Sequence, residues 1–169
     1  NKELLKYAQT DALTGLYNKE TTEQLTDELL SEDENKYHAF LILDVDCFKQ
    51  INDIYGHAVG DIVLQKFGKL LKGTFREGDI LGRIGGDEFG VIMKNIQTKD
   101  IAMKKAEELL AKTQAYKIDE LKGNNISISI GISTAPQDGD CYMDLYKRAD
   151  QALYQAKRSG KARVCNYFS

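Results

Sequence analysis

The sequence contains no tryptophan, a single proline and only three cysteines in 169 residues. With one proline, 14 glycines and 42% hydrophobic residues, the composition leaves no room for a disordered or low-complexity chain. The cysteines, Cys47, Cys141 and Cys165, are scattered and lack both a Cys-x-x-Cys pair and a histidine cluster. A disulfide framework or a zinc site is therefore not expected, and the thiols should be free, as in a reducing compartment.

The chain also lacks an excess of positive charge and any long apolar run. The chain has 23 Lys and Arg residues against 26 Asp and Glu residues, a net charge of −3. Nucleic-acid binding favours clustered positive charge, so a nucleic-acid partner is not expected. The longest apolar run, around residues 40–43, is far too short to cross a bilayer, and the N-terminus has no signal-peptide pattern. We expect a cytoplasmic domain without membrane contact of its own, alone or as the cytosolic part of a larger protein.

The hydrophobic pattern predicts one domain with a substantial core. The segment at residues 37–45 holds an unbroken apolar run at 39–43, which is typical of a central strand buried on both faces. Strict alternation at 126–133 predicts a strand with one buried face. Helices are expected at residues 1–9, 48–55, 60–75, 98–116 and 141–158, and from Asn18 to an acidic turn at 31–35, with further strands at 80–84, 89–93 and 162–167.

The resulting order is α-α-β-α-α-β-β-α-β-α-β, with a β-hairpin in the middle. Helices on one face of a mostly antiparallel, five-stranded sheet make an α+β two-layer domain, and a ferredoxin-like core with insertions fits this order. Residues 1–10 are interpreted as the end of a longer linker helix, because the pattern starts without a capping residue. Residues 11–169 then form the domain proper, and we expect an upstream sensory or dimerising domain in the native chain.

The sequence Gly-Gly-Asp-Glu at residues 85–88 lies between the two hairpin strands. Paired glycines suit a tight turn that needs positive φ, whereas two adjacent carboxylates repel each other unless a cation lies nearby. Asp44 and Asp46 end the central strand, where residues at i and i+2 point the same way. If the strands are neighbours, these carboxylates converge, which is typical of a magnesium site for phosphoryl transfer. A solvated turn is the alternative for either cluster alone.

Three stretches closely resemble the GGDEF-domain diguanylate cyclases: Asp-Val-Asp-Cys-Phe-Lys-Gln-Ile-Asn-Asp at residues 44–53, Tyr-Gly-His-Ala-Val-Gly-Asp at 55–61, and Arg-Ile-Gly-Gly-Asp-Glu-Phe at 83–89. The resemblance extends to residues 11–18, which match Asp-x-Leu-Thr-Gly-Leu-x-Asn, and to the late helix at 150–160, so it covers nearly the whole chain. It implies a palm-type nucleotidyl cyclase fold and the synthesis of cyclic di-GMP from two GTP, with release of two pyrophosphates.

By position, the resemblance makes Asp44, Asp87 and the backbone carbonyl of Val45 the ligands of two Mg²⁺ or Mn²⁺ ions. Asp87 would also help to deprotonate the attacking 3′-hydroxyl. Glu88 would be a third carboxylate, either catalytic or completing the electrostatics of the hairpin. The hairpin residues implied at the transition state are Arg83, Gly85 and Gly86.

The resemblance also implies that Asn52 and Asp61 bind guanine. A carboxylate can accept hydrogen bonds from guanine N1 and N2, donors that adenine lacks. Asp61 has an alternative role, because an anion in the first turn of a helix is stabilised by the helix dipole. His57 would lie near the ribose or base, or serve only as a turn residue. Phosphate contacts are implied for Phe48, Lys49, Lys157 and Lys161, although Lys49 and Lys157 could each be a solvated surface charge.

Arg76 and Asp79 match the family's R-x-x-D inhibitory site for product, although the bare pattern is also that of an ordinary turn. An arginine fork can bond phosphate or the guanine edge in pairs, and Asp79 can hold guanine as Asp61 does. Two positions depart from the family, which usually has arginine where this chain has Lys19 and Lys161. Lysine keeps the charge but loses the bidentate fork, so we expect weaker contacts there without loss of chemistry.

Cyclic di-GMP is a two-fold symmetric ring, so two subunits must face each other, each presenting one GTP. We therefore expect a homodimer in catalysis, with cyclic di-GMP as product and inhibitor. One alternative is a non-catalytic module that binds GTP or cyclic di-GMP; such relatives typically lose a metal carboxylate or a hairpin glycine, and this chain has lost neither. The other is a palm-type transferase acting on nucleic acid, against which the acidic charge argues.

Overall fold

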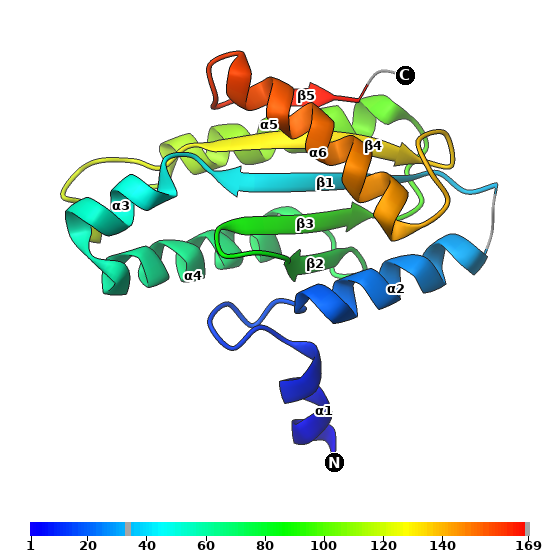
Figure 1. Ribbon diagram of the computed structural model, residues 1–169, viewed down its shortest axis with the longest axis horizontal. Helices are drawn as coiled ribbons and strands as arrows, with labels where there is room; N and C mark the ends of the chain where they lie inside the picture. The colour runs from blue at the N-terminus through cyan, green and yellow to red at the C-terminus, as the bar shows by residue number, and fades with distance from the viewer. Residues whose placement is uncertain (33–34, 168–169) are drawn as a thin grey trace.

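A five-stranded sheet forms the centre of the molecule in the computed structural model, which describes residues 1–32 and 35–167 (Figure 1). The strands are β1 (His38–Val45), β2 (Ile80–Arg83), β3 (Glu88–Met93), β4 (Ile128–Ala135) and β5 (Val164–Asn166). Their order across the sheet is β2-β3-β1-β4-β5, and every neighbouring pair is antiparallel except β4 and β5. The central strand β1 is buried along its whole length, as predicted.

The helices are α1 (Lys2–Gln9), α2 (Lys19–Glu32), α3 (Phe48–Tyr55), α4 (His57–Thr74), α5 (Lys99–Ala115) and α6 (Tyr142–Arg158), with a short 3₁₀ turn at Asp119–Leu121. The predicted order of helices and strands is therefore confirmed, and so is the mostly antiparallel sheet flanked by helices. The helices lie on both faces of the sheet rather than on one, because alternate residues of β1 face two separate cores. Leu41 and Leu43 pack with α4 and α5, whereas Phe40 and Ile42 pack with α2 and α6. The domain thus has three layers, not two.

Strand β4 differs from its prediction in having both faces buried. The face that carries small residues is covered by α6, and a Cβ on Gly131 would lie 2.1 Å from the carbonyl oxygen of Ala149. The hydroxyl of Ser133 donates to the carbonyl of Leu145 at 2.8 Å. Small and hydroxyl-bearing residues alternate with isoleucine here because a helix backbone packs directly on them, not because they face water.

Two helix starts also differ from expectation. The Asn1 side chain accepts a hydrogen bond from the N–H of Glu3 at 2.9 Å, so α1 does have a capping residue. Helix α4 starts at His57, directly after Gly56 with its φ of 91°, instead of at residue 60. Asp61 therefore lies beyond the first turn, where the dipole effect is weaker, and the alternative capping role loses its basis. Part of the predicted acidic turn at residues 31–35 falls outside the described residues.

The hairpin between β2 and β3 is present, but the prediction that its paired glycines supply positive φ was wrong. Neither Gly85 nor Gly86 lies in the positive-φ region. The connection spans residues 84–87, and the N–H groups of Ile84 and Gly85 both donate to the carbonyl of Glu88. A connection of this length does not need the two-residue turn types that demand positive φ.

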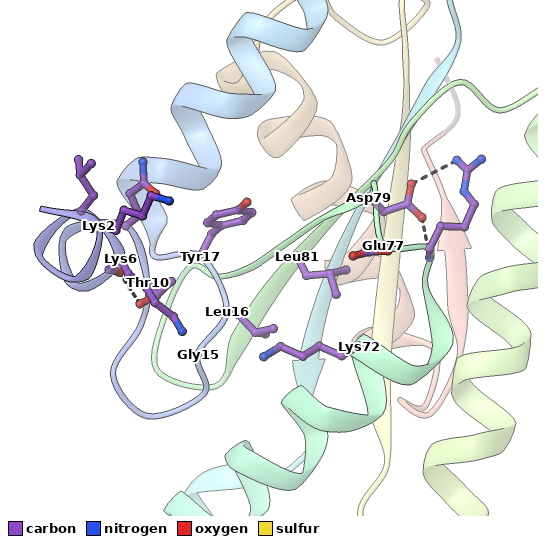
Figure 2. Close-up of a pocket in the computed structure, with 13 residues that line it drawn as sticks. Lys2, Lys6, Thr10, Gly15, Leu16, Tyr17, Lys72, Glu77, Asp79 and Leu81 are labelled. Atoms are coloured by element: carbon purple, nitrogen blue, oxygen red, sulfur yellow. Dashed lines mark hydrogen bonds and ion pairs between the residues drawn. The ribbon is translucent and has the colours of Figure 1, made fainter.

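Helix α1 and the loop that follows it pack beside the end of α4 and β2, and together they border a pocket (Figure 2). Within the described residues, no helix is long and apolar enough to span a membrane. The three cysteines are free thiols, as expected.

Candidate active site

The predicted carboxylates meet where β1 and β3 lie side by side. Asp44, near the end of β1, is paired directly with Glu88, the first residue of β3. Asp87 precedes Glu88, and its backbone carbonyl accepts a hydrogen bond from the N–H of Val45 at 3.3 Å. The sheet register therefore places Asp44, Val45 and Asp87 together, as the sequence predicted.

Asp44 is strongly perturbed by these surroundings. Its pKa is raised to about 7, chiefly by burial and also by the neighbouring Asp87, whereas Lys157 opposes the shift. Lys157, on α6, forms an ion pair with Oδ2 of Asp44, and Oδ1 is buried without a hydrogen-bond donor among the described residues. The Asp87 carboxylate disfavours the ionised form of Asp44, so a bound cation or a shared proton would lower the repulsion between the two groups.

This arrangement suits a hard divalent cation, which takes oxygen ligands from carboxylates and backbone carbonyls. The fit rests on the orphaned Oδ1 of Asp44 and its proximity to Asp87. Among the described residues, three potential ligand atoms lie within 4.8 Å of one another only at Asp140, Cys141 and Asp144. Asp44, Asp87 and Glu88 therefore do not close on a single point, and Asp87 is the carboxylate that raises the pKa of Asp44.

Asp46 does not join this group, contrary to the expected convergence of all four carboxylates. Its oxygens accept hydrogen bonds from the hydroxyls of Ser127 and Ser129, both at 2.6 Å, and from the N–H of Ala162 at 3.1 Å. The residue follows the end of β1, so the strand alternation no longer fixes its direction. Asp46 ties β1 to β4 and to the loop after α6, which is a structural role.

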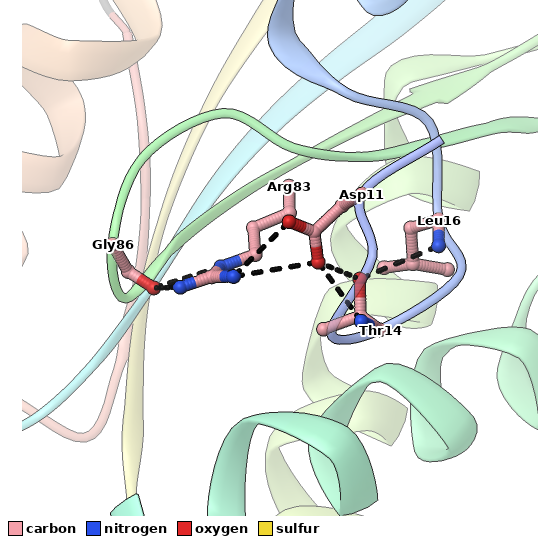
Figure 3. Close-up of polar contacts among 5 residues, drawn as sticks. All are labelled: Asp11, Thr14, Leu16, Arg83 and Gly86. Carbon is pink, nitrogen blue, oxygen red and sulfur yellow. Dashed lines mark hydrogen bonds and ion pairs between the residues drawn. The ribbon is translucent and has the colours of Figure 1, made fainter. Parts of the chain in front are cut away.

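Arg83 braces the hairpin (Figure 3). Its Nε and Nη2 donate to the carbonyl of Gly86 at 2.9 and 2.7 Å, and its Nη1 donates to both carboxylate oxygens of Asp11, the nearer at 3.1 Å. Asp11 in turn accepts from the N–H and hydroxyl of Thr14. Arg83 thus connects the hairpin to the loop at residues 11–18. Sequence reasoning missed this role of Asp11, although an Asp-x-x-Thr spacing is typical of a self-bonded loop.

Glu88 is held from the opposite direction by Tyr146 of α6. The Tyr146 hydroxyl donates to Oε1 of Glu88 at 2.8 Å. Burial raises the pKa of Glu88, and the hydrogen bond from Tyr146 opposes that shift. Nothing in the sequence near residue 146 points to this contact, because the two residues lie 58 positions apart.

The predicted base-binding residues lie on α3 and α4. Asn52 is half-buried on α3, and its Oδ1 is buried without a hydrogen-bond donor among the described residues. His57 and Asp61 are exposed on α4, which packs against α3. A buried amide oxygen without a partner costs free energy, which is consistent with a ligand-binding role.

The predicted phosphate contacts come from separate elements. Phe48 and Lys49 begin α3, with Phe48 half-buried and Lys49 exposed, whereas Lys157 ends α6 beside Asp44. Lys161 is exposed, and its Nζ lies 3.3 Å from Sγ of Cys47. The structure therefore places Lys157 and Lys161 at the edge where Asp44 lies. Lys19, the other departure from the family pattern, is exposed at the start of α2.

Arg76 and Asp79 line a separate pocket of about 650 Å³, shown in Figure 2. Asp79 is buried and accepts hydrogen bonds from the backbone N–H groups of Arg76 and Lys94, each at 3.1 Å. The guanidinium of Arg76 lies 3.2 Å from the same carboxylate. Other cations around the pocket are Lys2 and Lys6 of α1 and Lys72 of α4.

The comparisons with known proteins decide the family. The model named "Diguanylate cyclase, GGDEF domain" matches residues 8–163. The chain belongs to this family. Its predicted membership of the GGDEF-domain diguanylate cyclases is thereby confirmed.

Curated relatives agree with this assignment. The chain is 37% identical to Diguanylate cyclase A of Treponema denticola, over 97% of this chain and 46% of the relative. It is 38% identical to the response regulator PleD of Caulobacter vibrioides, over 95% of this chain and 36% of PleD. The chain thus spans less than half the length of these relatives.

Solved structures show the same fold. The coiled coil and GGDEF domain of DgcB from Caulobacter crescentus, solved in complex with c-di-GMP, superposes with a TM-score of 0.89 at 26% identity, covering 98% of this chain and 88% of that one. The GGDEF domain of TpbB from Pseudomonas aeruginosa superposes with a TM-score of 0.88 at 33% identity, covering 94% of each chain.

Proposed function

We propose that this chain is the catalytic domain of a diguanylate cyclase, which condenses two GTP into cyclic di-GMP and releases two pyrophosphates. The observation that carries the proposal is the pair formed by the buried Asp44 and the half-buried Asp87, set beside Val45 where β1 meets the hairpin. Residues 11–169 form this domain, and residues 1–10 link it to an upstream sensory or dimerising domain, a proposal supported by curated relatives that are more than twice as long as this chain. The domain acts in the cytoplasm.

Enzymes of this family are generally metal-dependent. We assign Asp44, Asp87 and the Val45 carbonyl as the residues that would hold two Mg²⁺ or Mn²⁺ ions. When bound, such ions neutralise phosphate charge and favour ionisation of a hydroxyl. Burial and the neighbouring Asp87 raise the pKa of Asp44, and a divalent cation bound here would relieve the repulsion between the two carboxylates.

The reaction forms a bond between the 3′-oxygen of one GTP and the α-phosphorus of the other, while the bond from that phosphorus to the β-phosphate oxygen breaks and pyrophosphate leaves. Asp87 accepts the proton of the attacking hydroxyl, and Glu88 is the neighbouring carboxylate of the same hairpin. Lys49, Lys157 and Lys161 bind phosphate oxygens. Phe48, which precedes Lys49 at the start of α3, contributes a further phosphate contact. A second, identical step closes the ring.

Guanine is read by Asn52 and Asp61, with His57 nearby. The exposed Asp61 carboxylate can accept from N1 and N2 of guanine, and the unpartnered Oδ1 of Asn52 can accept another hydrogen bond. Adenine presents no matching donors at N1 and C2, so this pair of residues favours GTP over ATP.

Ring closure requires a homodimer in which each subunit presents one nucleotide to the other. A domain of this size holds one GTP at the Asp44–Asp87 site, so the facing subunit supplies the second. An upstream dimerising segment would raise the effective concentration of the second site.

Product feedback acts at the pocket that contains Arg76 and Asp79. The pocket carries the cations Lys2, Lys6, Lys72 and Arg76 against the carboxylates Glu77 and Asp79, which suits a ligand with two phosphates. It is lined by none of the carboxylates of the Asp44–Asp87 site. Inhibition by cyclic di-GMP should therefore be non-competitive with GTP.

The test is to fuse the domain to a constitutive dimeriser, supply GTP and Mg²⁺, and identify the products by mass. Cyclic di-GMP above the level of an Asp87→Asn control supports the enzyme. No product above that control, with GTP or cyclic di-GMP still bound, would favour a non-catalytic binding module instead.

A further inference from the structure

We propose that Tyr146 is a positioning residue of the metal site. Its hydroxyl holds the Glu88 carboxylate in place, and Glu88 in that position supports cation binding by Asp44 and Asp87. The proposal rests on the proposed function for the identity of the site. Tyr146 lies on α6, outside the hairpin motif. Its hydroxyl has a role that is separate from the packing of its ring.

The first observation is the pairing of like charges across the sheet. Asp44 and Glu88 are directly opposite each other on β1 and β3, and like charges at such positions destabilise a sheet. Each of the two is held by a different residue of α6. Lys157 pairs with Asp44, and the Tyr146 hydroxyl donates to Oε1 of Glu88 at 2.8 Å.

The second observation is the geometry of α6. Tyr146 and Lys157 are eleven residues apart, close to three turns, so both project from the same face of the helix. Ala149 and Leu153 lie between them on that face and are buried against the sheet. The helix is therefore fixed on β1 and β4, and it presents one long side chain to each carboxylate of the pair.

The third observation is the chemistry of the donor. Burial and the nearby Glu88 raise the pKa of Tyr146, so the phenol keeps its proton and can only be the donor in this contact. A hydrogen bond to one oxygen fixes the plane of a carboxylate and leaves the other oxygen open. Hydrogen-bond partners in the outer shell of a metal site keep its surrounding groups in place, and their loss typically weakens metal affinity by about 10–100-fold.

The substitution Tyr146→Phe isolates the hydroxyl, because phenylalanine keeps the ring that packs 5.9 Å from Tyr142. We expect Mn²⁺ binding to the chain with GTP, measured by electron paramagnetic resonance of free Mn²⁺, to weaken about tenfold. In turnover assays, the Mn²⁺ concentration at half-maximal rate should rise by the same factor, while kcat at saturating Mn²⁺ stays within about twofold. Tyr154→Phe is the matched control, since Tyr154 is an exposed tyrosine of the same helix.

A double-mutant cycle separates positioning from general weakening. In a Glu88→Gln background, Tyr146→Phe should cause no further loss of Mn²⁺ affinity, because the carboxylate that it positions is gone. Equal losses in both backgrounds, or unchanged Mn²⁺ affinity in Tyr146→Phe, would overturn the proposal even if the chain makes cyclic di-GMP. A Glu88-dependent loss of Mn²⁺ affinity in a chain that makes no cyclic di-GMP would support the proposal and refute the proposed function.

Discussion

A Cβ atom on Gly60 would lie 1.9 Å from Oδ1 of Asn52. The side chain of Asn52, on α3, therefore occupies the space that a larger residue on α4 would fill. The same Cβ would also lie 3.2 Å from the ring of Phe48. The direction of the Asn52 amide, and hence the proposed contact with guanine, depends on the absence of a side chain at residue 60.

The substitution Gly60→Ala should displace the Asn52 amide and weaken guanine recognition. We expect KM for GTP to rise about tenfold, the effect of losing one well-placed polar contact, and selectivity for GTP over ATP to fall. Steady-state kinetics with both nucleotides measure the change. Gly73→Ala is the matched control, because Gly73 lies in the same helix with nothing within 4 Å of its Cβ position. It should gain up to about 1 kcal/mol of helix stability without affecting KM.

Asp44 should make stability depend on pH in metal-free buffer. Its pKa is about 7 in the folded protein against a usual value of 3.8, so the folded state holds the proton more tightly. The stability that this gives is fully present below pH 3.8 and is lost as the pH rises to about 7. Asp44→Asn removes this loss and should be the more stable protein at pH 8, by more than about 1 and less than about 4 kcal/mol.

Urea unfolding with a chelator present, at pH 5 and pH 8, measures this difference. Asp46→Asn is the matched control, because it makes the same chemical change two residues away. It should lower stability instead, since Asp46 accepts hydrogen bonds from Ser127, Ser129 and Ala162. Parallel pH profiles for Asp44→Asn and the unsubstituted chain would contradict the electrostatic account.

The sequence predicted what depends on local pattern and on motif. Hydrophobic periodicity placed the central strand and the order of elements, and the motif placed Asp44 and Asp87 at one site. The sequence alone could not show that β4 is buried on both faces. Serine and glycine alternating with isoleucine are expected both on a face exposed to solvent and on a face covered by a closely packed helix. The direction of Asp46, beyond the end of its strand, was set by Ser127 and Ser129, which lie more than 80 residues away. The contact between Tyr146 and Glu88 could be found only from the folded structure, because the two residues lie 58 positions apart in the sequence.

Arg83 should support activity by holding the hairpin in place with its hydrogen bonds, and not only by its positive charge. Arg83→Lys keeps the positive charge, but one ammonium group cannot bond both the Gly86 carbonyl and the Asp11 carboxylate. We expect the free energy of unfolding to fall by about 1–3 kcal/mol and kcat to fall at least tenfold. Chemical denaturation and turnover assays test this, with Arg158→Lys at an exposed position of α6 as the control. An unchanged kcat would show that the hairpin does not need this brace.

Product inhibition should depend on the pocket around Arg76. The Arg76 side chain is 60% exposed, and its guanidinium, which bonds Asp79 and the Lys94 carbonyl, can turn toward a ligand. The backbone N–H groups of Arg76 and Lys94 then continue to bond Asp79. Arg76→Ala should raise the inhibition constant of cyclic di-GMP at least tenfold and leave KM for GTP unchanged. Lys72→Ala should act in the same direction, whereas Lys69→Ala, an exposed lysine of the same helix outside the pocket, should not. Unchanged inhibition in Arg76→Ala would place the inhibitory site elsewhere.

The central claim is that Asp44 and Asp87 form a site at which two GTP are joined. The most direct measurement counts the products of the dimerised domain by mass and by pyrophosphate assay, with Mg²⁺ and then with a chelator. The account predicts two pyrophosphates for each cyclic di-GMP, with no product from Asp44→Asn, from Asp87→Asn or in the chelator. Cyclic di-GMP formed at the same rate by either variant would contradict it.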